Sequence, residues 1–170
     1  VVWRSEGGNA SARWIDERRL LISERAPGPG RYTTLSVVNL ADGTSYPLGT
    51  WHSIRNIQIA PGGDRLIFFS TFNPDPSLDG AYVLEIAPSV PPERLPWFGD
   101  YRWRDSESVY TITFDPATDI QRLNYYRVPT GEAFPLTDPQ QQPFLFDHQI
   151  DGGNLGFFLE ETDDVFCASH

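Results

Sequence analysis

The sequence contains no Lys, no Met, three His and a single Cys, Cys167. One Cys excludes an intrachain disulfide framework and a zinc site built on several Cys, and without Lys no Schiff base can form on the chain. Apolar runs are only a few residues long, which excludes a membrane-spanning helix and a coiled coil. Positive charge is also scarce, because 13 Arg stand against 23 acidic residues and give a net charge of -10. Such a field repels phosphate backbones, so nucleic acid is not an expected partner.

Turn-forming and aromatic residues are abundant in this chain of 170 residues, with 14 Gly, 15 Pro and 14% aromatics. A turn followed by a run of β-formers recurs four times, at residues 14–23, 59–70, 103–112 and 150–159. The spacings are 46, 43 and 46 residues when Leu20, Leu66, Val109 and Leu155 are taken as equivalent. A fixed period of this size is typical of an all-β repeat fold.

Each of the first three copies is followed by a second β-run and then by an apolar-Pro-apolar segment. The prolines of these segments are Pro47, Pro96 and Pro135. Proline cannot donate to a strand ladder, so each segment is predicted to be an outer edge strand. Asp42-Gly43 and Thr130-Gly131 supply the positive φ that a tight hairpin needs. With one more β-run ahead of each turn, the predicted unit is four antiparallel strands with an edge marked by proline.

Four-stranded units of this length, stacked around an axis, are the blades of a β-propeller. A β-sandwich also has short strands and frequent turns, but it does not explain why the proline edge recurs. We expect a single propeller domain over residues 1–170, with blades at about 9–50, 51–98, 99–138 and 139–170 plus 1–5. Either the strand at residues 1–5 completes the fourth blade and closes the ring, or the chain is a fragment of a larger propeller. Because the chain begins with Val, we expect its native start to be missing.

The segment 59–68, Ile-Ala-Pro-Gly-Gly-Asp-Arg-Leu-Ile-Phe, is similar to the strand-turn-strand signature of TolB-type, WD40-like propeller repeats. The segment 79–83, Asp-Gly-Ala-Tyr-Val, resembles a second part of that repeat, and Trp14 and Trp103 stand near its aromatic position. Only the second copy meets the full motif. Such repeats occur in periplasmic adaptor proteins and in the propellers of prolyl-oligopeptidase-type peptidases. The resemblance therefore implies binding or gating, specifies no reaction and favours a periplasmic or secreted location.

We expect no enzymatic activity, because no nucleophile, base and orienting group can be named together. The sequence has no Gly-x-Ser-x-Gly, His-Glu-x-x-His or P-loop pattern. Asp147 and His148 could form an orienting pair, but a His in a propeller blade is more often a bridge between strands.

A run rich in oxygen ligands, Asn73, Asp75, Ser77 and Asp79 before Gly80, has the alternating pattern of a calcium loop. A calcium hand would need Glu where Ile86 stands, and Glu85 is one residue away. An ordinary long loop between strands is the alternative, so no cofactor is expected and Ca²⁺ is kept as a lesser possibility.

Binding is expected on the face formed by the loops after each second strand and each outer strand. Its candidate residues combine aromatics with Asp, a mixture suited to a protein partner or a small ligand. They are Tyr32, Trp51, His52, Phe72, Asp75, Asp79, Asp100, Asp115 and Asp119. The aromatics could equally be plugs over the blade ends. The predicted function is a non-enzymatic interaction or ligand-binding module with an acidic loop face, and the alternative is the gating propeller of a larger hydrolase.

Overall fold

A computed structural model describes residues 9–115, 120–137, 143–146, 154–159 and 165–169. The chain divides into two compact units, residues 1–95 and 96–170, called here the first and second units. Both are built from antiparallel strands, and the one helix among the described residues is a single 3₁₀ turn, η1 (Pro76–Leu78). No described helix is long and apolar enough to cross a membrane.

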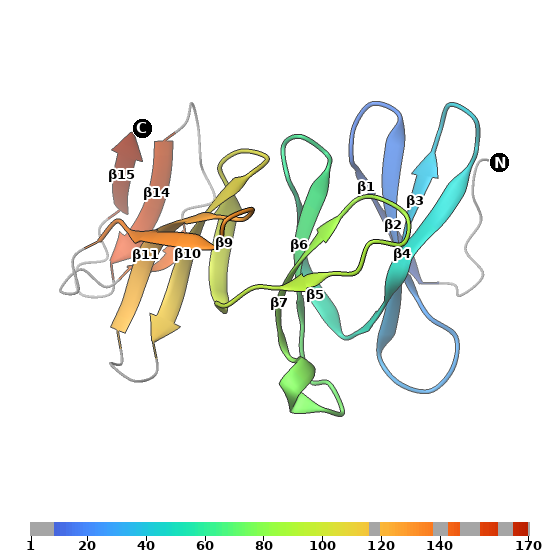
Figure 1. Ribbon diagram of the computed structural model, residues 1–170, viewed down its shortest axis with the longest axis horizontal. Coiled ribbons are helices and arrows are strands. Elements are labelled where there is room, and N and C mark those ends of the chain that lie inside the picture. The colour runs from blue at the N-terminus through green and yellow to red at the C-terminus, as the bar shows by residue number, and fades with distance from the viewer. Residues whose placement is uncertain (1–8, 116–119, 138–142, 147–153, 160–164, 170) are drawn as a thin grey trace. The chain divides into compact units, whose positions relative to one another are not determined.

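The first unit contains two four-stranded sheets in which each strand pairs with the next along the chain (Figure 1). The first sheet has the order β1 (Ala10–Trp14), β2 (Arg19–Arg25), β3 (Tyr32–Asn39) and β4 (Ser45–His52). The second has the order β5 (Ile54–Ile59), β6 (Arg65–Ser70), β7 (Gly80–Glu85) and β8 (Glu93–Arg94). Hairpins of this kind need only short connections.

The second unit repeats the arrangement. One four-stranded sheet runs β9 (Gly99–Trp103), β10 (Ser108–Asp115), β11 (Ile120–Arg127) and β12 (Glu132–Pro135). A further sheet has three described strands, β13 (Pro143–Phe146), β14 (Asn154–Leu159) and β15 (Val165–Ser169). These separate meander sheets confirm the predicted four-stranded antiparallel units and exclude a sandwich of two sheets. The strand expected at residues 1–5 lies outside the described residues.

The prolines lie where the missing N–H is harmless. Pro47 is in β4 opposite Ser36, and Pro135 is in β12 opposite Asn124. Both strands are edges of their sheets, as the sequence predicted. In the second sheet the proline lies outside the edge strand, because β8 ends at Arg94, two residues before Pro96.

Asp side chains shape the turns that precede β2 and β10. Asp16 accepts hydrogen bonds from the backbone N–H groups of Arg18 and Arg19, both at 2.8 Å. Asp105 accepts one from the N–H of Glu107 at 2.9 Å. Such Asx turns satisfy backbone donors that no strand partner reaches, so the repeat places short polar side chains there.

The core of the first unit lies between its two sheets. Phe68 is fully buried, and its ring centroid lies 5.0 Å from that of Trp51 and 5.7 Å from that of Tyr82. Burial of such side chains stabilises the fold by about 1.5–3 kcal/mol each. The buried members of the cluster are Leu21, Leu35, Val37, Leu48, Ile57, Leu66, Phe68, Leu84 and Ile86. In the second unit, Trp97 packs on Tyr101 and Tyr126, each 5.8 Å away between ring centroids.

Candidate functional site

Three connections meet at one end of the first unit: residues 26–31 between β2 and β3, Ser53 between β4 and β5, and residues 71–79 between β6 and β7. We call this region the loop end. Figure 1 shows the two longer connections extending beyond the sheets on the same side. The N–H of Ser53 donates to the carbonyl of Arg31 at 2.6 Å, and the hydroxyl of Ser70 donates to the carbonyl of His52 at 2.9 Å. One backbone and one side-chain hydrogen bond therefore tie the connections of both sheets together.

Tyr32 and His52 form an aromatic pair at this end. They are directly opposite each other at the ends of β3 and β4, and their rings meet edge to face at 5.0 Å. Nδ1 of His52 lies 3.4 Å from the carbonyl oxygen of Thr71. The pair therefore links the first sheet to the loop that follows β6.

The loop at residues 71–79 is organised by Asp79. Its carboxylate accepts hydrogen bonds from the N–H of Phe72 at 3.1 Å, and from the N–H and Nδ2 of Asn73 at 2.9 and 2.7 Å. Hydrogen bonds from Asn73, from its backbone and then its side chain, lower the pKa of Asp79. Asp75 caps η1 by accepting from the N–H of Ser77 at 2.9 Å. Hydrogen bonds between polar groups of the loop thus fix its conformation.

Phe72 is the most exposed of the large hydrophobic side chains of this region, with 68% of its surface accessible. Its φ is 55°, in the left-handed region that residues with a side chain rarely adopt. Arg55 Cζ lies 6.0 Å from the ring centroid, within reach of a cation–π contact. Backbone strain of this kind is found at functional sites, where the surrounding structure holds it in place.

Charge at the loop end is of both signs. Asp75 and Asp79 lie in one connection, while Arg31 lies in another and Arg55 reaches the ring of Phe72. Arg94, at the end of β8, donates to the carbonyl oxygens of Ser77 and Asp79 at 3.0 and 2.7 Å. The described part of this end is therefore mixed in charge rather than acidic throughout.

The calcium pattern has a different explanation in the structure. The oxygens of Asp79 and Asp75 accept hydrogen bonds from N–H donors of their own loop. Among the described residues, no three His, Cys, Asp or Glu side chains group closely enough to hold a metal ion. The oxygens of Asp75 and Asp79 take part in turn formation, and calcium binding by this loop stays a prediction.

The other predicted residues are dispersed. Trp51 packs its ring against the buried Phe68 and is partly buried. Its ring therefore covers the core and does not join the exposed aromatic side chains of the loop end. Asp100 was expected in a loop of the second unit, but it lies in β9 and pairs with Arg102 at 3.1 Å. Asp115 is the last residue of β10. Asp119, Asp147 and His148 lie outside the described residues.

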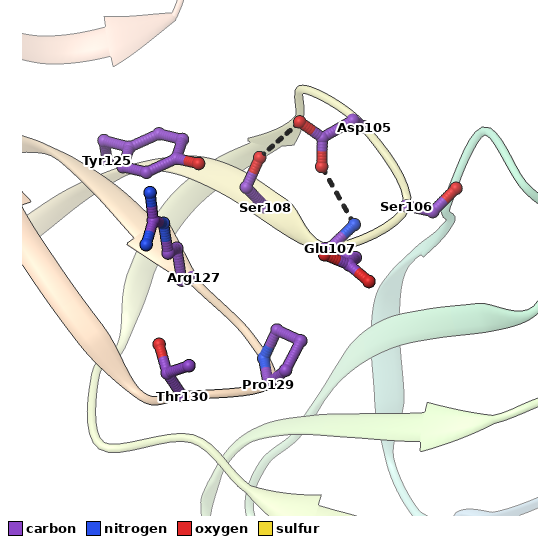
Figure 2. Close-up of a pocket in the computed structure, with 8 residues that line it drawn as sticks. All are labelled: Asp105, Ser106, Glu107, Ser108, Tyr125, Arg127, Pro129 and Thr130. Carbon is purple, nitrogen blue, oxygen red and sulfur yellow. Dashed lines mark hydrogen bonds between the residues drawn. The ribbon is translucent and has the colours of Figure 1, made fainter.

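A second candidate site lies in the second unit and was not predicted. It is a pocket of about 580 Å³ between the β9–β10 turn and the β11–β12 turn (Figure 2). Its lining is Asp105, Ser106, Glu107, Ser108, Tyr125, Arg127, Pro129 and Thr130. Tyr125 and Arg127 are two apart on β11 and therefore share a face, and Ser108 is directly opposite Arg127.

Hydrogen bonds and charges perturb several groups in this pocket. Hydrogen bonds from Ser108 and then Arg127 lower the pKa of Tyr125. Partial burial raises the pKa of Asp105, but hydrogen bonds from Ser108 and Glu107 outweigh it and the net shift is downward. Ser108 Oγ lies 2.7 Å from Asp105 Oδ2. Arg104 and Arg127 place their guanidinium carbons 5.3 and 5.9 Å from the centre of the Tyr125 ring. Perturbed groups gathered in a hollow are a physical mark of a binding site.

A sequence signal for this pocket did exist. The segment Asn124-Tyr125-Tyr126-Arg127 places a Tyr and an Arg on one face of a strand, beside a turn that carries Asp105 and Glu107. In the repeat pattern, residues 103–112 are one more copy of the unit, and the predicted binding loops lie at the opposite ends of the strands. The location of the pocket depends on strand register, because the pairing of β10 with β11 brings these residues together.

Solved structures provide the comparison. TolB from Acinetobacter baumannii matches with a TM-score of 0.52 and 14% identity over 98% of this chain and 44% of its own. A putative TolB from Agrobacterium tumefaciens matches with a TM-score of 0.54 and 15% identity over 98% and 59%. This chain has the TolB-type β-propeller fold. An uncharacterized protein of Listeria monocytogenes matches with a TM-score of 0.53 and 12% identity over 92% and 52%.

The propeller spans about half the length of these structures. No protein-family model matches its sequence, and no curated protein does. At these identities the likeness shows the fold, and function has to be argued from the two sites themselves.

Proposed function

We propose that this propeller is a non-enzymatic module that binds another protein through the loop end of its first unit. The observation that carries the proposal is Phe72, an exposed aromatic ring fixed in a left-handed backbone conformation by the carboxylate of Asp79. A large exposed ring on a backbone that is already fixed loses less conformational freedom on binding than one on a flexible loop. Tyr32, which is 39% exposed, and Leu78, which is 53% exposed, extend the apolar surface of this end.

The expected partner presents an apolar pocket that receives Phe72, bordered by groups of both charges. Arg55 beside the ring would meet a carboxylate of the partner, and Asp75 in the same loop would meet a basic group. The absence of enzymatic activity remains part of the proposal. His52 is the one His among the described residues, and its ring neighbours are Tyr32 and the carbonyl of Thr71 rather than a nucleophile.

A photo-cross-linking residue placed at position 72 tests the proposal in cells of the source organism. Position 114 is the matched control, because Phe114 is also an exposed aromatic, with 49% of its surface accessible, and it lies in the second unit. We expect one protein to be trapped from position 72 and not from position 114. The purified partner should then bind the wild-type chain, and Phe72→Ala should weaken binding about thirty-fold or more, while Phe114→Ala leaves it unchanged. Equal binding by the two variants would overturn the proposal.

A further inference from the structure

The pocket of the second unit holds charges of opposite sign on facing walls. Figure 2 shows Tyr125 and Arg127 on one side, and Asp105 and Glu107 across from them. A simple anion would meet two carboxylates, and a simple cation would meet the guanidinium of Arg127. A ligand that carries both charges avoids both conflicts.

Arg127 has donors available for an anionic group. Its nearest carboxylate is that of Glu132, 3.6 Å away, and both side chains are 53% exposed. A guanidinium carries five N–H donors in a planar fork, so this loose surface pair leaves room for a carboxylate to bind with two hydrogen bonds. The Tyr125 ring, 5.9 Å from Arg127 Cζ, helps to orient the fork towards the hollow.

The carboxylates of Asp105 and Glu107, on the other wall, differ in the hydrogen bonds that they make. Asp105 is engaged by Ser108 Oγ and the N–H of Glu107. The side chain of Glu107 makes no hydrogen bond or ion pair with any other residue that the structure describes. Glu107 is thus the acceptor for an ammonium group, which offers three donors, and Asp105 fixes the turn that presents it.

The size of the hollow matches a small organic molecule. About 580 Å³ falls within the range of about 300–1,000 Å³ that is typical of small-molecule sites. Pro129 and Tyr125 add apolar surface to the lining of the hollow. We propose that this pocket binds a small zwitterion, either a free amino acid or a short peptide with free ends, with the carboxylate of the ligand on Arg127 and its ammonium group on Glu107. The site is separate from the loop end of the first unit, so it does not depend on the function proposed above.

Calorimetric titration of the full chain with glycylphenylalanine tests this site, alongside free phenylalanine and two blocked dipeptides. One of the blocked probes is N-acetylated and the other is C-amidated. We expect the free-ended dipeptide, free phenylalanine or both to bind, and either block to weaken dipeptide binding about ten-fold or more. Tighter binding of the dipeptide would identify a peptide as the ligand, and tighter binding of phenylalanine would identify an amino acid.

Variants assign the two ends of the ligand. Arg127→Gln should abolish the preference for a free carboxylate, and Glu107→Gln should abolish the preference for a free amine. Arg127→Lys keeps the charge without the fork and should lose part of the affinity. Arg122→Gln, a change of the same kind elsewhere on β11, should bind like the wild type. Thermal unfolding of each variant shows that it is folded. Absence of binding by both free-ended probes up to about 10 mM, equal binding of the blocked probes, or an unchanged Arg127→Gln would overturn the proposal.

Discussion

Oδ2 of Asp79 accepts a hydrogen bond from the backbone N–H of Phe72 at 3.1 Å, seven residues earlier in the chain. This contact closes the base of the β6–β7 loop and holds Phe72 at a φ of 55°. Oδ1 of the same carboxylate takes the N–H and side-chain amide of Asn73. One acidic side chain thus sets the position of the ring on which the proposed interface depends.

The contribution of Asp79 to stability should depend on pH. Hydrogen bonds from Asn73 lower its pKa in the folded state below its ordinary value of 3.8. That stability is fully present above the ordinary value and is lost as the pH falls through the lower folded value. Asp79→Asn should therefore have a lower melting temperature than the wild type at pH 7, and the gap should narrow at pH 3. Melting curves at the two pH values measure this, and an equal gap at both would contradict it.

Removing a phenylalanine ring should cost much stability at Phe68 and little at Phe72. Phe68 is fully buried between Trp51 and Tyr82, so Phe68→Ala should reduce the free energy of unfolding by about 3–5 kcal/mol. Phe72 is 68% exposed, and Phe72→Ala should change it by no more than about 0.5 kcal/mol. Urea unfolding measures both. A large loss from Phe72→Ala would mean that its ring belongs to the core.

The positive φ of Phe72 predicts that glycine at this position gives a more stable protein than alanine does. Alanine at this position keeps the steric cost of a positive φ, whereas glycine has no Cβ and relieves it. Phe72→Gly should therefore be more stable than Phe72→Ala by about 1 kcal/mol in urea unfolding. In an extended strand or a helix the order would be reversed, so an observed reversal would rule out the left-handed conformation.

Gly99 should not tolerate a side chain. It is paired with Thr113 across the β9–β10 ladder, and a Cβ there would overlap the carbonyl oxygen of Ile112. Gly99→Ala should cost about 1–3 kcal/mol or more in urea unfolding, because backbone atoms cannot give way. Gly80→Ala is the comparison, since its Cβ would meet the flexible side chain of Arg94 at 2.8 Å and should cost less. Equal costs would show that the β9 backbone can shift.

Local sequence patterns were sufficient to predict the repeating four-stranded unit. The recurring turns, the Asp-Gly and Thr-Gly hairpins and the prolines at Pro47 and Pro135 are properties of short segments. Each specifies φ or hydrogen-bonding capacity for its own few residues, so the antiparallel units could be predicted without knowing what packs on them. Tyr32, His52 and Phe72 were placed near one another for the same reason, because the connections of such units alternate between two ends.

Direction and burial of side chains could not be predicted in this way. Trp51 and His52 are neighbours in sequence, but the alternation along β4 turns the first ring onto Phe68 and the second towards Tyr32. Asp100, which the turn pattern places in a loop, lies in β9 because the strand begins one residue earlier, at Gly99.

The four-stranded unit and its proline edge follow from residue type and local backbone geometry, and so does the lack of an intrachain disulfide or of a Lys that could form a Schiff base in this chain. Which charged groups come together depends on how the strands pair in the folded chain. Ser108 and Arg127 are 19 residues apart in the chain and directly opposite in the sheet, and no local pattern fixes the register that pairs them. The pocket between Arg127 and Glu107 is a product of that register.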